Sequence, residues 1–131
     1  MTYPVVLVVD DETDSADLLG MVLGIHFPQA TVRVAYGGQA ALDLASRQRP
    51  DAAVLDLEMP GLDGEKLARA LRALFPDAAP FLIALSGNLV RLAAIRGTGA
   101  FDHELSKPAD MDRLVSLLKK KLSRSGRDPA G

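Results

Sequence analysis

The sequence has 131 residues, no cysteine and two histidines. This length fits one domain, and the lack of cysteine excludes disulfides, thiolate metal sites and cysteine nucleophiles. The formal net charge of −2 is not the basic excess typical of nucleic-acid binders. Apolar runs such as Val5–Val9 are far shorter than the ~20 residues of a membrane-spanning helix, and no secretory signal pattern is visible. We therefore expect a cytoplasmic protein whose chain contacts neither nucleic acid nor membrane.

Short apolar runs alternate with amphipathic stretches along the chain. Compact β-branched runs predict strands, and a period of 3.6 residues predicts helices. The helix that precedes Pro28 carries its large apolar residues at roughly helical spacing: Leu18, Leu19, Val22, Leu23 and Ile25. In chain order we predict strand 5–9, helix 13–27, strand 31–36, helix 38–48, strand 52–55, helix 65–75, strand 81–85, helix 89–96, strand 101–105 and helix 110–122.

Strict alternation of strands and helices predicts a parallel sheet with helices on both faces. Right-handed crossovers leave few topologies for such a chain. We favour an α/β doubly wound five-stranded sheet in the flavodoxin-like order 2-1-3-4-5. We expect one domain over residues 1–122 and a flexible polar tail over residues 123–131.

Polar side chains follow four of the predicted strands. Asp10 and Asp11 come after the first strand, Asp56 ends the third, Ser86 ends the fourth, and Lys107 follows the fifth. In a parallel sheet the functional crevice lies at the carboxyl ends of the strands, so these side chains should meet there. Three converging carboxylates would raise one another's pKa.

A hard divalent cation such as Mg²⁺ would relieve that repulsion, because it prefers carboxylate, water and phosphate oxygens. A carboxylate beside Mg²⁺ and Lys107 can attack phosphorus as a nucleophile. The developing charge would be met by Mg²⁺, Lys107 and Ser86. Each feature also has a simpler interpretation. The Asp10–Glu12 segment could cap a helix, Asp56 could be a solvated loop acid, Ser86 could belong to a capping turn, and Lys107 could be a surface residue.

Four motifs in this order resemble the receiver domain of two-component response regulators, over Val5 to about Leu122. The second motif is the most specific of the four. They are Val8-Val9-Asp10-Asp11-Glu12, Leu55-Asp56-Leu57-Glu58-Met59-Pro60-Gly61-Leu62-Asp63-Gly64, Leu85-Ser86-Gly87 and Leu105-Ser106-Lys107-Pro108.

The resemblance implies that Asp56 accepts a phosphoryl group from a histidine kinase or a histidine phosphotransfer protein. Ser86 and Lys107 would contact the phosphoryl oxygens, and the Lys107–Pro108 bond would be cis. Such a domain is not an enzyme beyond self-phosphorylation from small donors and slow self-dephosphorylation. The implied Mg²⁺ ligands are Asp10, Asp11, Asp56 and the backbone carbonyl of Glu58.

One position departs from the family pattern. Receivers often carry an aromatic residue or histidine three residues before the lysine, where this chain has Glu104, with His103 just before it. Either His103 takes that role through a shifted or bulged strand, or there is no aromatic switch. The downstream partner would bind the segments that commonly form the output face of receivers, which are residues 89–96, 101–105 and 110–122.

Two other functions fit parts of the pattern. One is a receiver-like interaction module that works without phosphorylation. The other is a Mg²⁺-dependent aspartyl-phosphate hydrolase of the haloacid-dehalogenase type, although here Glu58 stands where such enzymes carry a second aspartate. The cognate kinase, the pathway, the oligomeric state and any output domain are not specified by the sequence.

Overall fold

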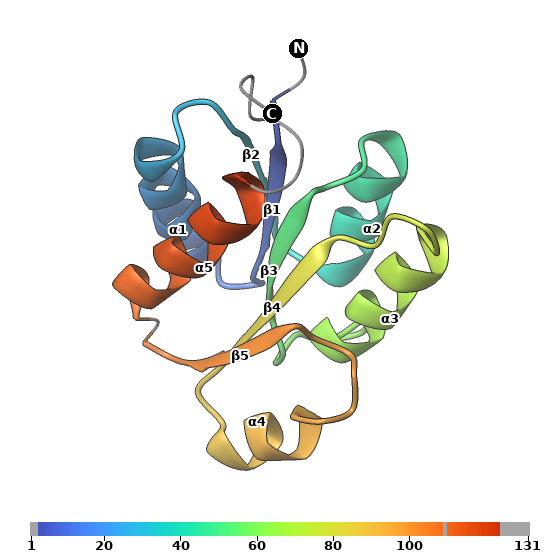
Figure 1. Ribbon diagram of the computed structural model, residues 1–131. Helices are drawn as coiled ribbons and strands as arrows, with labels where there is room; N and C mark the ends of the chain where they lie inside the picture. The colour runs from blue at the N-terminus through green and yellow to red at the C-terminus, as the bar shows by residue number, and fades with distance from the viewer. Residues whose placement is uncertain (1–2, 109, 124–131) are drawn as a thin grey trace.

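Five parallel strands form one sheet in this protein, whose computed structural model describes residues 3–108 and 110–123 (Figure 1). The strand order is β2-β1-β3-β4-β5, which confirms the predicted topology. Because β1 lies between β2 and β3, the first and third strand ends are neighbours. The strands are β1 (Val5–Val9), β2 (Thr31–Ala35), β3 (Ala52–Asp56), β4 (Phe81–Ser86) and β5 (His103–Ser106).

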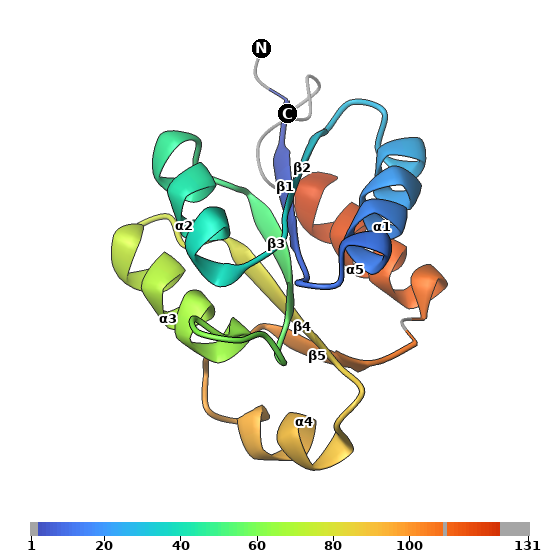
Figure 2. The ribbon, with the colours of Figure 1, turned by 180° about the vertical axis from the view of Figure 1, so that it is seen from behind.

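Helices cover both faces of the sheet. Helices α1 and α5 lie on one face, and α2 and α3 lie on the other (Figures 1 and 2). Helix α4 packs Leu92 and Ile95 against the same core as α2 and α3. The helices are α1 (Thr13–His26), α2 (Gly38–Arg47), α3 (Gly64–Leu74), α4 (Leu89–Ile95) and α5 (Met111–Ser123).

The sheet separates two apolar clusters. Successive side chains of a strand point to opposite faces, so Leu7 of β1 packs on the α2–α3 side while Val6 and Val8 pack on the α1–α5 side. All five residues of β1 and of β3 are buried. Burial on both faces explains why these strands are continuous apolar runs rather than alternating ones.

The fifth strand begins two residues later than predicted. The alternation of Phe101, His103 and Leu105 suggested a strand from Phe101, but β5 begins at His103. Asp102 holds the chain to β4 before pairing starts, since its amide donates to the Leu82 carbonyl and its carboxylate accepts from the Leu82 amide, both at 2.8 Å. Phe101 is buried in the α2–α3 core without being part of the strand. Every other predicted boundary agrees with the structure within one residue.

Helix α1 buries only part of the apolar set that its spacing suggested. Its buried residues are Ala16, Gly20 and Leu23, whereas Leu18 and Ile25 are exposed. A side chain at Gly20 would meet Val34 of β2 at 2.6 Å, so only a glycine lets the helix lie this close to the sheet. Of the larger apolar residues in the predicted set, Leu23 is buried and Leu19 and Val22 are partly buried, whereas Leu18 and Ile25 face solvent.

Among residues 3–108 and 110–123, none of the helices has the length and apolar character required to cross a membrane. The predicted flexible tail, residues 123–131, lies outside the described residues except for Ser123, which ends α5.

Candidate functional site

Three carboxylates meet at the carboxyl edge of the sheet. Asp10 and Asp11 follow β1, and Asp56 is the last residue of β3. One carboxylate oxygen from each lies within 4.8 Å of the other two. Asp10 and Asp56 are only 6% and 4% exposed, whereas Asp11 is exposed. The predicted convergence of these residues is therefore correct, and their all-oxygen donor set fits a hard cation such as Mg²⁺.

Lys107 reaches this cluster from the end of β5. Its Nζ lies 3.0 Å from Asp10 Oδ2 and 3.4 Å from Asp56 Oδ1. The Lys107 amide donates to the Ser86 carbonyl at 2.9 Å, which continues the β4–β5 pairing up to the lysine. The Lys107–Pro108 peptide is cis, as the resemblance implied. The structure thus places a cation against the two buried carboxylates, and Lys107 is not a free surface residue.

Backbone amides fix the two buried carboxylates. The Glu12 amide donates to Asp10 Oδ1 at 3.0 Å, and the Glu58 amide donates to Asp56 Oδ1 at 3.2 Å. The capping role considered for the Asp10–Glu12 segment belongs to Glu12, whose carboxylate accepts from the Ser15 amide at the start of α1. Asp10 is therefore held by the turn after β1 and faces the cluster.

Burial dominates the electrostatics of Asp56. Loss of solvent raises the pKa of Asp56 from 3.8 to about 6, and the neighbouring Asp10 adds to this shift. The charge of Lys107 and the Glu58 amide favour the ionised form but do not cancel the effect of burial. For Lys107, burial lowers the pKa, yet the hydrogen bond that it donates to Asp10 and the charges of Asp56 and Asp10 raise the pKa above its ordinary value overall. Lys107 therefore stays cationic at neutral pH beside a carboxylate that protonates easily.

Ser86 is fully buried at the end of β4, next to the carboxylates in the sheet. Its hydroxyl donates to Glu58 Oε1 at 2.5 Å and accepts from the Asn88 amide at 2.9 Å. The capping role considered for the turn after β4 belongs to Asn88, whose side chain accepts from the Arg91 amide at the start of α4. The contact between Ser86 and the Glu58 side chain is a feature that the sequence did not indicate.

The loop after β3 passes very close to the site. A Cβ atom added to Gly64 would lie 2.3 Å from the Asp56 carbonyl oxygen and 2.9 Å from Leu57 Cα. Both contacts are with backbone, so only glycine allows α3 to begin this close to Asp56. Asp63 caps α3 and also forms an ion pair with Arg91 of α4 at 3.3 Å. The loop after β3 is therefore tied to α4.

Glu104 occupies the position where receivers often have an aromatic residue. Its side chain is 13% exposed and pairs with Arg96 at 3.5 Å. The β4–β5 register continues through Ile83–His103 and Ala84–Glu104 without a bulge. His103 instead packs edge-on against Phe81, with ring centroids 5.6 Å apart. His103 and Glu104 thus point to opposite faces of the sheet, and His103 does not stand in for an aromatic residue at position 104.

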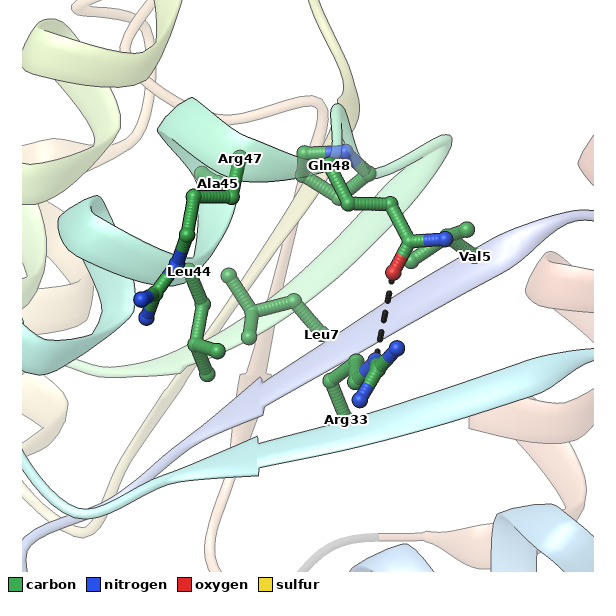
Figure 3. A pocket seen from close by; sticks show the side chains of 8 residues that line it. Val5, Leu7, Arg33, Leu44, Ala45, Arg47 and Gln48 are labelled. Atoms are coloured by element: carbon green, nitrogen blue, oxygen red, sulfur yellow. Dashed lines mark hydrogen bonds between the residues drawn. The ribbon is translucent and has the colours of Figure 1, made fainter.

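A separate hollow lies between β1, β2 and α2 (Figure 3). It is lined mainly by aliphatic side chains, and Arg33 Nε donates to Gln48 Oε1 at 3.2 Å across it. None of its eight lining residues carries a carboxylate or a hydroxyl. This hollow therefore offers neither a nucleophile nor an anionic metal ligand.

Comparison with known proteins points to one family. The family model of the response regulator receiver domain matches residues 6–119. The transcriptional regulatory protein PrrA of Mycobacterium bovis is 37% identical over 126 residues, covering 96% of this chain and 53% of that protein. Response regulator MprA of Mycobacterium avium is 33% identical over 120 residues, covering 92% of this chain and 51% of that protein. The chain therefore spans about half the length of the curated relatives it matches.

Solved structures agree with this assignment. The signal receiver domain of a DNA binding response regulator from Colwellia psychrerythraea has a TM-score of 0.80 and 28% identity, covering 89% of this chain and 96% of that one. The receiver domain of a Francisella response regulator has a TM-score of 0.78 and 28% identity, covering 92% and 98% of the two chains.

Proposed function

Since this chain belongs to the response regulator receiver family, we propose that it is a phosphoacceptor signalling domain with Asp56 as the acceptor. One observation carries this assignment: the buried Asp56 carboxylate lies 3.4 Å from Lys107 within a cluster of three carboxylates. The phosphoryl donor is a histidine kinase or a histidine phosphotransfer protein.

The transfer is a displacement at phosphorus. An oxygen of the Asp56 carboxylate attacks the phosphorus atom of a phosphohistidine, and a P–O bond forms as the P–N bond breaks. The electron pair of the broken bond returns to the imidazole nitrogen. Lys107 and the Ser86 hydroxyl stabilise the negative charge on the phosphoryl oxygens. The 3.4 Å distance between Lys107 Nζ and Asp56 Oδ1 supports this role, because the ammonium already lies beside the attacking carboxylate.

Mg²⁺ is the cofactor that this donor set fits. Asp10, Asp11 and Asp56 would hold it, together with the backbone carbonyl of Glu58. Bound Mg²⁺ offsets negative charge on the carboxylates and on the phosphoryl oxygens. The amide contacts of Glu12 and Glu58 keep Asp10 and Asp56 directed into the cluster before any ligand arrives.

Dephosphorylation returns the domain to its starting state. Water attacks phosphorus, the P–O bond to Asp56 breaks, and inorganic phosphate leaves while Asp56 regains its charge. The chain is thus a signalling element rather than an enzyme with a separate substrate. In the resting structure the Glu58 carboxylate accepts a hydrogen bond from the Ser86 hydroxyl, which supports a positioning role for Glu58 over that of the general acid or base of a hydrolase.

The downstream partner binds the output face, which we define as α4, β5 and α5. Leu89 and Val90 at the start of α4 are 68% and 80% exposed, which supports a contact role. Glu104 favours one alternative, a module that binds partners without phosphorylation, because the aromatic residue of the usual switch is replaced by an ion pair with Arg96.

A small-molecule phosphoryl donor separates these two functions. The protein is incubated with acetyl phosphate and Mg²⁺, and its intact mass is measured beside the Asp56→Asn variant and a sample with EDTA. We expect one added phosphoryl group that requires both Asp56 and Mg²⁺. If the folded protein gains no phosphoryl group from acetyl phosphate or from a phosphorylated histidine phosphotransfer domain, the phosphorylation-independent module is favoured.

A further inference from the structure

The Ser86 hydroxyl already donates its only proton to a fixed partner in the resting structure. A hydroxyl has one proton to donate, and Ser86 donates it to Glu58 Oε1 at 2.5 Å. Its oxygen accepts from the Asn88 amide at 2.9 Å. Ser86 is 0% exposed, so water does not compete for that proton. The acceptor is a carboxylate, which makes this a charge-assisted hydrogen bond of the stronger kind.

A phosphoryl group on Asp56 needs that same proton. Its oxygens are acceptors, so Ser86 can stabilise them only by donating. The Glu58 carboxylate and the phosphoryl group are therefore rivals for one proton. They also carry like charges, so the phosphoryl group disfavours Glu58 in its resting position beyond the competition for the proton.

We propose that Glu58 is a positioning residue that holds the Ser86 hydroxyl in the resting state and must release it when Asp56 is phosphorylated. This inference rests on the proposed function. Glu58 thereby sets how readily the domain enters its phosphorylated conformation, in addition to supplying a backbone carbonyl to the metal.

The surroundings of Glu58 allow such a release. Glu58 is exposed on the loop after β3, so its side chain can swing into solvent without leaving a cavity in the core. Ser86 lies at the end of β4, where the chain turns through Asn88 into α4. The ion pair between Asp63 and Arg91 at 3.3 Å joins the loop after β3 to α4. Breaking the Ser86–Glu58 bond therefore removes a side-chain tie between the loop after β3 and the end of β4.

Beryllofluoride, an anion that mimics a phosphoryl group on a carboxylate, tests the competition at equilibrium. The beryllium concentration for half saturation is measured from amide shifts at fixed Mg²⁺ and fluoride. Glu58→Ala should bind about tenfold more tightly than the parent, as expected for removal of a competing charge-assisted bond. Glu58→Gln keeps a neutral acceptor and should gain about threefold. Asp14→Asn removes an exposed carboxylate from the first turn of α1 without touching Ser86 and should stay within about twofold of the parent.

Repeating the Glu58→Ala measurement in a Ser86→Ala protein distinguishes competition for the Ser86 proton from electrostatic repulsion between Glu58 and the anion. There the gain from Glu58→Ala should fall to about twofold, because only the repulsion between like charges is left to remove. The inference would be overturned if Glu58→Ala tightened beryllofluoride binding equally with Ser86 present and with Ser86→Ala, or if it did not tighten binding when Ser86 is present. Either result would leave the acceptor role of Asp56 intact. A parent protein that binds no beryllofluoride at saturating Mg²⁺ would instead contradict the proposed function itself.

Discussion

Replacing Asp56 by asparagine should stabilise the metal-free protein, and more so as the pH rises. Burial holds the pKa of Asp56 at about 6, above its usual 3.8. The native state then binds a proton more tightly than the unfolded chain does. The stability due to that proton is complete below pH 3.8 and is lost as the pH rises through 6. Asparagine is neutral at every pH and does not incur this loss.

The size of the effect follows from the shift. The stability lost between pH 4.5 and pH 7.5 is about 2 kcal/mol if the unfolded carboxyl has its ordinary pKa. For a domain of this size that difference corresponds to roughly 8 °C in Tm. Unfolding by urea in EDTA, at both pH values and for both proteins, measures it. The advantage of Asp56→Asn should grow by that amount at the higher pH.

An opposite trend would refute this reasoning. If the parent gained stability relative to Asp56→Asn as the pH rose, the attraction of Lys107 for ionised Asp56 would outweigh its burial. A difference that does not change with pH would mean that Asp56 has an ordinary pKa in the native state. Either result would remove the electrostatic strain that makes a cation favourable at this edge of the sheet.

Two further predictions concern the metal and the loop after β3. Mg²⁺ without phosphate should raise the stability of the parent by about 1.4 kcal/mol at ten times its dissociation constant. Asp11→Asn should abolish most of that gain, and an equal gain in both proteins in thermal unfolding would place the cation elsewhere. Gly64→Ala should cost about 1–3 kcal/mol, since its Cβ would meet backbone at 2.3 Å. Gly24→Ala, with nothing within 4 Å, should instead stabilise α1 slightly, and equal urea midpoints for the two variants would contradict the close approach.

The sequence predicts the site as a set of neighbours because the topology leaves little freedom. Once the strands are parallel and β1 lies beside β3, Asp10 and Asp56 must end at the same edge. Lys107 reaches the same edge from the end of β5. The raised pKa of Asp56 also follows the predicted direction, although burial contributes more to it than the neighbouring carboxylate does.

Features that depend on loops and on helix rotation could not be predicted. The contact between Glu58 and Ser86 depends on the path of the chain after β3. This loop turns at Gly61, with a φ of 72°, and returns at Gly64 to within van der Waals contact of the Asp56 backbone. Hydrophobic spacing does not encode such a path. In α1 the buried face carries Ala16 and Gly20, so the larger Leu18 is exposed. The apolar spacing correctly included the buried Leu23, but it could not show that small residues form the rest of the contact with the sheet.

The central claim is that Asp56 carries the phosphoryl group, and chemical trapping tests it most directly. Borohydride reduces an aspartyl phosphate to homoserine, which peptide mass spectrometry locates in the sequence. After incubation with acetyl phosphate and Mg²⁺, we predict homoserine at position 56 and at no other aspartate. Homoserine at Asp10 or Asp11, or label that survives in Asp56→Asn, would contradict the assignment of the acceptor.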